Sequence, residues 1–350
     1  MSAKQDPSVL RAVLRPCAEF LSDPDLFEVV INQPGEVRVE GRGGWTTHKR
    51  PELTFEWAVS LSRAVATWSH QAISDTHPLL SATLPGGERI QIVVPPAVAA
   101  GTVSMTLRKP SATTYSLDEL AGFGLFDAVR RADARSAADV VLLDLHRLGD
   151  WREFLRQAVL ARKNIVISGA TGSGKTTLSK ALIAHIPPHE RVISVEDAPE
   201  LVIPQENNVR LFYSKGGQGV AKVGPTELLE ACMRMRPDRI LLQELRDGTA
   251  FDYIVNVNSG HPGSITTVHA DSAALALERL TLLVKQSEGG RDLARDDVRG
   301  LLMTMVDVIV QCHKLDGRFR VTEVDFALAR SSAGAPMPTT APLLDGELAA

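Results

Sequence analysis

The chain has 350 residues, of which 44% are hydrophobic, 23% are charged and 5% are aromatic. At about 100–200 residues per domain, this length predicts two or three domains, and the average composition excludes a disordered chain or a fibrous repeat. The 38 basic and 42 acidic side chains give a net charge of −4, so we expect no global attraction to nucleic acid or anionic lipid.

The cysteines and the apolar segments bear on the cellular compartment. Cys17, Cys232 and Cys312 are far apart and odd in number, which indicates a reducing compartment and excludes a cysteine-based zinc framework. Residues 1–6 lack the pattern of a secretory signal, and the most apolar stretch, residues 90–103, is shorter than the roughly 18 residues that span a bilayer. We therefore predict a soluble, cytoplasmic chain.

The first 110 residues carry mainly strand and turn signals. The predicted strands are residues 27–31, 37–39, 80–84, 89–94 and 103–108. Residues 53–71 lack glycine and proline and carry spaced apolar side chains, which predicts a helix. This order predicts a small α+β domain over residues 1–110. Residues 111–145 follow as a predicted linker with short helices.

The pattern changes from Asp150 onward. Apolar side chains over residues 151–159 fall on one face of a predicted helix. Short apolar runs then alternate with helical patterns, which is typical of buried strands in an α/β sheet. The predicted strands are residues 165–167, 192–195, 240–242 and 264–268, with a late hairpin formed by 306–311 and 318–324. We assign residues 146–330 to this α/β domain and expect the tail, 331–350, to be disordered because it lacks lysine, arginine and aromatic residues.

The strongest local signal is a phosphate-binding loop at residues 169–176, which matches GxxxxGK[ST] at every fixed position. A predicted strand precedes it and a helical pattern follows, as such a loop requires. Glycine lets the backbone N–H groups wrap a phosphate, while Lys175 should reach the β and γ phosphates and Thr176 should ligate Mg²⁺. We therefore predict that the chain binds ATP with Mg²⁺. The predicted nucleotide-binding residues are Gly169, Ala170, Thr171, Gly172, Ser173, Gly174, Lys175, Thr176 and Thr177.

Polar side chains end three of the predicted strands after this loop. Hydrolysis needs a carboxylate that holds the metal or orients water, and Glu244 ends the apolar run 239–243 where such a group belongs. Glu196 ends a second strand, although it or its neighbour Asp197 could instead cap the next turn. His269 ends a third strand, where a lone histidine would usually be structural.

Together these motifs resemble a known family, the hexameric traffic ATPases of type II and type IV secretion, and in particular the type IV branch. The resemblance rests on four segments: residues 169–176, 194–197, 234–246 and 260–271. The N-terminal stretches 87–96 and 107–111 are also similar, so the resemblance covers most of residues 20–330.

The resemblance implies a P-loop, RecA-like ATPase domain that follows a smaller N-terminal α+β domain, with ATP in the cleft between the two domains. Glu196 then matches an acidic-box residue that is catalytic and metal-binding, and Glu244 matches the catalytic, metal-binding glutamate. His269 matches a catalytic residue near the γ phosphate. Arg89 and Arg108 match arginines that close over the phosphates, although from the residues alone they could be solvated edge-strand side chains.

The family also implies a function: a homo-oligomer, most simply a hexameric ring, that powers a type IV secretion system from the inner face of the cytoplasmic membrane. Its partners would be channel proteins of the inner membrane and a secreted substrate, with no direct nucleic-acid contact expected. Effector protein, DNA and pilus subunit remain open as cargo. Two positions depart from the family pattern, since Gln243 replaces a usual glycine and Thr249 a common glutamate. Turnover could be slow if Gln243 crowds the phosphates.

Three other readings remain open at this stage. A nucleotide-gated assembly platform with little turnover would fit the two departures. A P-loop kinase for a small molecule would need a second-substrate motif, and none is evident in the sequence. DNA translocation would need a local basic face and salt-sensitive binding to DNA.

Overall fold

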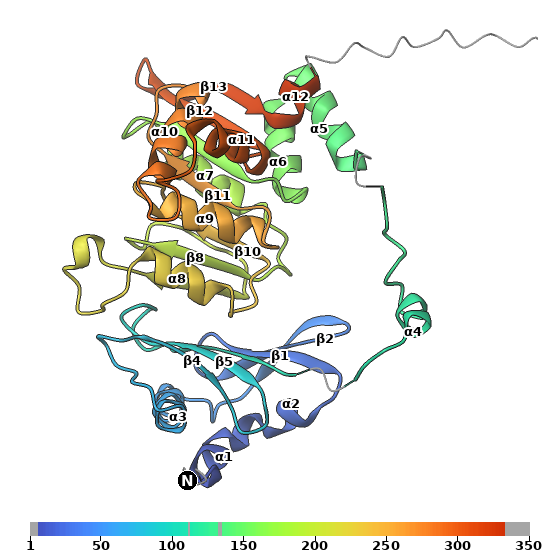
Figure 1. Ribbon diagram of the computed structural model, residues 1–350, viewed down its shortest axis with the longest axis vertical. Coiled ribbons are helices and arrows are strands. Elements are labelled where there is room, and N and C mark those ends of the chain that lie inside the picture. The colour runs from blue at the N-terminus through green and yellow to red at the C-terminus, as the bar shows by residue number, and fades with distance from the viewer. Residues whose placement is uncertain (1–5, 111–112, 132–134, 333–350) are drawn as a thin grey trace, which may run out of the picture.

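The computed structural model describes residues 6–110, 113–131 and 135–332, which form two stacked units (Figure 1). Residues 113–131 run past one side of these units and carry the short helix α4 (Leu117–Gly122). Among the described residues, no helix is both long enough and apolar enough to cross a membrane. The three cysteines are buried and free.

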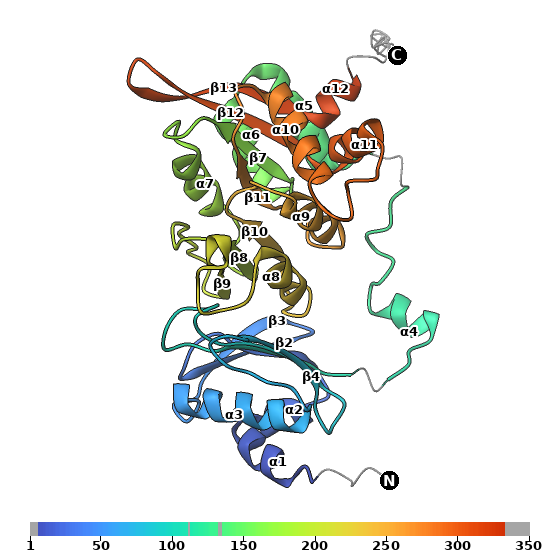
Figure 2. The same cartoon turned by 60° about the vertical axis from the view of Figure 1, so that its left-hand side comes forward.

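The N-terminal unit is a six-stranded antiparallel sheet in the order β3-β2-β1-β6-β5-β4. Its strands are β1 (Leu26–Ile31), β2 (Glu36–Gly41), β3 (Gly44–Lys49), β4 (Leu79–Thr83), β5 (Arg89–Val93) and β6 (Ser104–Arg108). Its helices are α1 (Ser8–Leu14), the 3₁₀ turn η1 (Arg15–Cys17), α2 (Ala18–Ser22) and α3 (Phe55–Trp68). These helices cover the sheet face that points away from the C-terminal unit (Figures 1 and 2).

The five strands and the helix predicted for this part of the sequence are present as β1, β2, β4, β5, β6 and α3. Gly35, with φ of +82°, supports the β1–β2 turn, and the Thr54 hydroxyl accepts a hydrogen bond from Trp57 N–H at the start of α3. The sequence did not predict α1, α2 or β3. β3 is an edge strand with one large apolar side chain, Trp45, so its pattern is weak.

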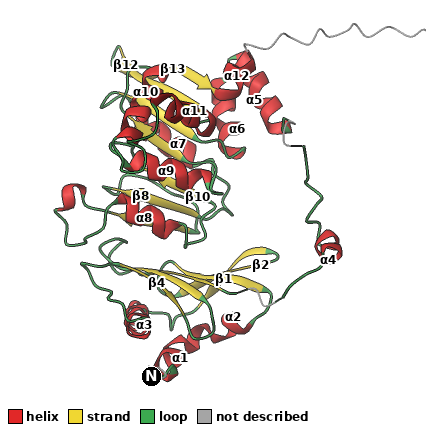
Figure 3. Ribbon diagram, viewed as in Figure 1, coloured by secondary structure: helices red, strands yellow, loops and turns green. Residues whose placement is uncertain are grey.

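The C-terminal unit is a mixed α/β layer built on two linked sheets (Figure 3). One is parallel in the order β10-β8-β9, and the other has the order β11-β7-β12-β13, in which only β13 is antiparallel. The strands are β7 (Ile165–Gly169), β8 (Val192–Glu196), β9 (Asn208–Phe212), β10 (Arg239–Leu242), β11 (Ile265–Val268), β12 (Val308–Leu315) and β13 (Arg318–Phe326). Leu245 N–H donates to Thr267 O at 2.8 Å and so joins the end of β10 to β11.

Helices flank these sheets and connect their strands. They are α5 (Ala137–Leu148), α6 (Trp151–Leu160), α7 (Lys175–Ile183), the 3₁₀ turn η2 (Lys215–Gly217), α8 (Pro225–Cys232), α9 (Thr249–Asn258), α10 (Ala273–Lys285), α11 (Arg295–Met305) and α12 (Ala327–Ser332). Every residue of β7, β8, β10 and β11 is buried, as expected for parallel strands that are covered on both faces. The predicted strands and the late hairpin are all present, whereas β9 was not predicted.

The predicted linker, 111–145, is too long at its C-terminal end. Helix α5 begins at Ala137, with Ser136 and Asp139 forming a capping box, and its buried Leu142 belongs to the same apolar core as β7. Residues from 137 onward are therefore part of the C-terminal unit. At the other end, Tyr115 accepts a hydrogen bond from Arg42 of the N-terminal unit. Residues 333–350 of the predicted disordered tail lie outside the described residues.

A buried arginine joins the two units. Arg191, at the base of β8, is fully buried and donates from Nη1 to Asn32 Oδ1 of the N-terminal unit at 2.9 Å. Its Nε–H donates to Met235 O at 2.9 Å, and Asn207 Oδ1 also accepts from Nη1. A backbone hydrogen bond also crosses this seam between the two units, since Phe212 N–H donates to Ala97 O. The N-terminal sheet is therefore anchored at the β8–β9 side of the C-terminal unit.

Candidate active site

The phosphate-binding loop lies between β7 and α7, as the sequence predicted. Gly172 and Gly174 have φ values of +74° and +93°, which residues with side chains rarely adopt. A side-chain carbon on Gly169 would lie 2.4 Å from Cys312 O, so this position also requires glycine. The backbone thus forms an open cradle at the N-terminus of α7, where the helix dipole favours an anion.

Lys175 points back over this cradle. Its Nζ donates to Gly169 O at 2.7 Å and to Ala170 O at 2.9 Å, and it lies 3.4 Å from His269 Nδ1. Burial lowers the pKa of Lys175, and the negative charge of Glu244 opposes this effect. An anionic phosphate beside Nζ would stabilise the charged ammonium in the same way.

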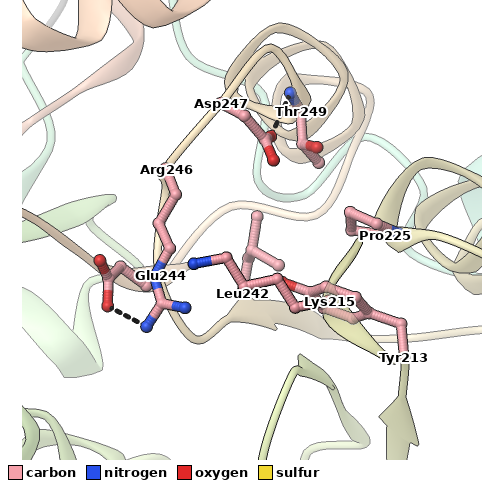
Figure 4. Close-up of a pocket in the computed structure, with 8 residues that line it drawn as sticks. All are labelled: Tyr213, Lys215, Pro225, Leu242, Glu244, Arg246, Asp247 and Thr249. Atoms are coloured by element: carbon pink, nitrogen blue, oxygen red, sulfur yellow. Dashed lines mark hydrogen bonds and ion pairs between the residues drawn. The ribbon is translucent and has the colours of Figure 1, made fainter. Parts of the chain in front are cut away.

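Glu244 and His269 meet beside Lys175, as their strand-end positions predicted. The side chain of Glu244 is 13% exposed; its Oε1 lies 3.0 Å from His269 Nε2, and its Oε2 accepts from Arg246 Nη2 at 2.8 Å (Figure 4). Burial alone would raise the pKa of Glu244, but the hydrogen bond from Arg246 and the nearby positive charges outweigh it, so this pKa is lowered. Glu244 is therefore an ionised carboxylate at neutral pH.

Positive side chains surround this carboxylate. Lys215, Arg246 and Arg279 line a hollow together with Glu244 and His269. In Figure 4, the side chains of Lys215 and Arg246 both extend toward Glu244. Such a convergence of cations beside the loop suits the charge of a bound triphosphate. The sequence did not single out Lys215 or Arg279, because neither lies in a recognisable motif.

Glu196 has a different environment from the one predicted. Its carboxylate is fully buried and accepts four hydrogen bonds. The donors are Ser194 Oγ at 2.6 Å, Leu201 N at 3.0 Å, Arg210 Nε at 2.9 Å and Arg210 Nη2 at 2.7 Å. A carboxylate offers about four lone-pair sites, so none remains for a cation. These contacts make Glu196 a buried partner of Arg210 and do not support the predicted role as a metal ligand.

Gln243 does not direct its amide toward the cradle. Its Oε1 accepts from Asp197 N–H at 3.2 Å, and its Nε2 donates to Glu200 Oε2 at 3.0 Å. Asp197 also accepts from Arg246, the residue that holds Glu244. Gln243 thus ties the turn after β8 to the end of β10. At the second departure, Thr249 N–H donates to Asp247 Oδ1 at 3.0 Å and begins α9.

Arg89 and Arg108 lie opposite one another on β5 and β6 of the N-terminal sheet. Arg108 forms an ion pair of 3.5 Å with Glu28, and its side chain is 71% exposed. Within the described part of the chain, no hydrogen bond or ion pair joins either arginine to the phosphate-binding loop, Glu244 or His269. The structure therefore does not bring these two predicted residues to the rest of the site.

The residues present fit a phosphate and a magnesium ion. Ser173 Oγ is buried beside the cradle without a hydrogen-bond partner, and nothing lies within 4 Å of a side-chain carbon built on Gly172. Thr176, at the start of α7, and Glu244 offer the oxygen ligands that Mg²⁺ prefers. Among the described residues, no cluster of three His, Cys, Asp or Glu side chains could hold a metal alone. Mg²⁺ commonly binds through one or two protein oxygens together with nucleotide phosphates, and Thr176 and Glu244 suit that arrangement.

The fold and this site define a P-loop ATPase. The family described as "Type II/IV secretion system protein" matches residues 53–315. The chain is 56% identical over 329 residues to the type IV secretion system protein VirB11 of Bartonella quintana, a match that covers 91% of this chain and 92% of that protein. The VirB11 of Brucella suis is 47% identical over 304 residues, covering 86% of this chain and 84% of that protein.

A solved structure agrees with these matches. The crystal structure of the VirB11 ATPase from the Brucella suis type IV secretion system, in complex with sulphate, superposes with a TM-score of 0.87 at 43% sequence identity. The match covers 93% of this chain and 97% of that one. The chain therefore belongs to the type II/IV secretion system protein family, and its relatives place it among the ATPases of type IV secretion.

Proposed function

We propose that this ATPase powers a type IV secretion system as a hexameric ring, in which ATP draws the N-terminal unit onto the C-terminal unit and hydrolysis releases it. The observation that carries the proposal is the contact chain from Lys175 through His269 to Glu244. It joins the phosphate-binding loop to Glu244, a carboxylate that can orient water. The relative that was solved with sulphate supports an anion-binding role for this fold.

Lys175 and the loop N–H groups bind and neutralise the triphosphate. Thr176 and Glu244 would hold Mg²⁺, which would supply charge neutralisation for phosphoryl transfer. Arg246 and Arg279 add positive charge at the side of the hollow where the γ phosphate is transferred.

Glu244 orients and polarises the attacking water. Its lowered pKa makes it a weak base, which suits a loose phosphoryl-transfer transition state, since positioning matters more there than early proton removal. His269 lies between Glu244 and Lys175 and so can report whether the γ phosphate is present.

Arg89 and Arg108 are proposed to reach the phosphates only when the units close or when subunits assemble. The Arg108 side chain is 71% exposed and its ion pair with Glu28 is long, at 3.5 Å, so the guanidinium is available for such a movement. Partners of the ring would be channel proteins at the cytoplasmic face of the inner membrane, together with the secreted substrate. Protein, DNA and pilus subunits remain alternative cargoes.

Sedimentation velocity and steady-state ATP hydrolysis, measured over the same range of protein concentration, test this proposal. We expect specific activity to rise as a hexamer forms, and Arg108→Gln to reduce activity without preventing assembly. Activity per subunit that is constant from monomer to oligomer would contradict the ring mechanism. A chain that assembles with ATP but does not hydrolyse it would be a nucleotide-gated platform instead.

A further inference from the structure

An exposed aromatic ring lies directly on the phosphate-binding loop. Phe319, near the start of β13, packs against the bare Cα of Gly174: a side-chain carbon there would lie 2.9 Å from Phe319 Cγ. The residue is nevertheless 56% exposed. One part of the ring therefore contacts the loop while much of it remains open to solvent.

The pairing of the strands places this ring on a defined side of the loop. β7, which leads into the loop, has β11 on one side and β12 with β13 on the other. His269 and Glu244, which mark the γ-phosphate end, follow β11 and β10. The loop itself binds the middle of the triphosphate, so the nucleoside end must leave on the opposite side, where the β12–β13 hairpin stands.

The face of the β12–β13 hairpin that carries Phe319 also lies beside the phosphate-binding loop at other positions along the hairpin. Phe319 pairs with Lys314, and Val321 pairs with Cys312, which in turn pairs with Gly169 of β7. Directly paired residues share one face of a hairpin, so these side chains point to the same side. Val321 is 43% exposed, which extends the apolar surface beside the ring.

We propose that Phe319 is the stacking platform for the nucleotide base, and therefore a ligand-binding residue of the ATPase. A flat, exposed ring at the loop is suited to stack on a purine. Such stacking does not depend on which base is bound, but it needs an aromatic side chain. This inference rests on the proposed ATPase site and adds to it the residue that binds the nucleoside. Lys314, the cross-strand neighbour, lies where it can approach the same ligand.

Isothermal titration of the full chain with ADP and with inorganic pyrophosphate, both with Mg²⁺, tests the proposal. We expect Phe319→Ala to weaken ADP binding about tenfold (about 1.4 kcal/mol) and pyrophosphate binding less than about twofold. Phe319→Tyr should bind ADP within about threefold of the wild type. Phe319→Leu is the matched control, because it keeps an apolar side chain against Gly174 but cannot stack; it should resemble Phe319→Ala.

Equal loss for ADP and pyrophosphate, or recovery of ADP binding in Phe319→Leu, would overturn the proposal, since the ring would then only support the loop. Unchanged ADP binding in Phe319→Ala would also overturn it. If that variant changed only the self-association of the chain, the ring would contact a neighbouring subunit and not the base. These titrations need no turnover. A wild type that binds ADP but does not hydrolyse ATP would refute the proposed function and leave this test intact.

Discussion

The buried pair of Glu196 and Arg210 gives a stability prediction that can be worked out from the structure. In Arg210→Ala, Glu196 keeps the hydrogen bonds from Ser194 and Leu201 and loses both from the guanidinium. Hydrogen bonds to charged groups contribute about 1.5–3 kcal/mol each. The Arg210 side chain is 29% exposed, so water can partly replace the guanidinium as a hydrogen-bond donor, and about 1.5 kcal/mol per bond applies. The expected loss is about 3 kcal/mol, at the low end for breaking a buried ion pair.

Thermal and urea unfolding should show this loss directly. For a unit of this size, about 3 kcal/mol corresponds to a fall in Tm of roughly 6–12 °C. Arg210→Lys keeps the charge without the paired geometry and should lose about half as much. The double variant Glu196→Gln/Arg210→Met should be less destabilised than the sum of its single changes, because no buried charge is left alone.

The same variants separate a structural role of Glu196 from metal binding. We expect the Mg²⁺ concentration for half-maximal ATPase activity to stay within about twofold in Arg210→Lys. If Arg210→Ala unfolds at the wild-type temperature, and Glu196→Gln shifts the Mg²⁺ dependence about tenfold, the structural reasoning is refuted and Glu196 is a metal ligand.

Three further predictions concern the seam between the units and the end of β10. Burial raises the pKa of Glu28 to about 7, against 4.5 in the unfolded chain, so the folded state binds the proton more tightly. The free energy of unfolding should therefore fall by roughly 3 kcal/mol as pH rises from about 4.5 to 7, and Glu28→Gln should flatten this slope in urea titrations. Asn32→Ala removes an acceptor from the buried Arg191 and should cost about 1.5–3 kcal/mol in urea unfolding; an unchanged midpoint would show that the seam contributes nothing there. Gln243→Gly should cost about 1 kcal/mol of stability and leave KM for ATP within about twofold, since the amide bonds Asp197 and Glu200; a several-fold fall in KM would show that Gln243 crowds the phosphates after all.

Local patterns predicted much of the site. The loop at 169–176 is read from consecutive residues, and Glu244 and His269 each end a buried parallel strand, so a common sheet edge brings them together. Helix α5 could have been found in the same way, because its capping box at Ser136 and its terminal Gly149, with φ of +74°, are local signals.

Other features depend on contacts that no local pattern contains. The Glu196–Arg210 pair requires that β8 and β9 lie side by side in parallel, and β9 is only five residues long. Arg191 is a charged residue that would be expected at the surface; it is buried because an asparagine from the other unit accepts its hydrogen bond. Phe319 gains its place from the pairing of β12 with both β7 and β13, so its position over Gly174 follows only from the assembled sheet.

The most direct test of the account compares wild type and Glu244→Gln in steady-state ATP hydrolysis, with ATP binding measured in parallel. Because Glu244 is placed to orient water while Lys175 and the loop bind the phosphates, kcat should fall at least about 100-fold and the Kd for ATP should stay within about threefold. Hydrolysis by Glu244→Gln at the wild-type rate would contradict the assignment of Glu244 as the catalytic carboxylate.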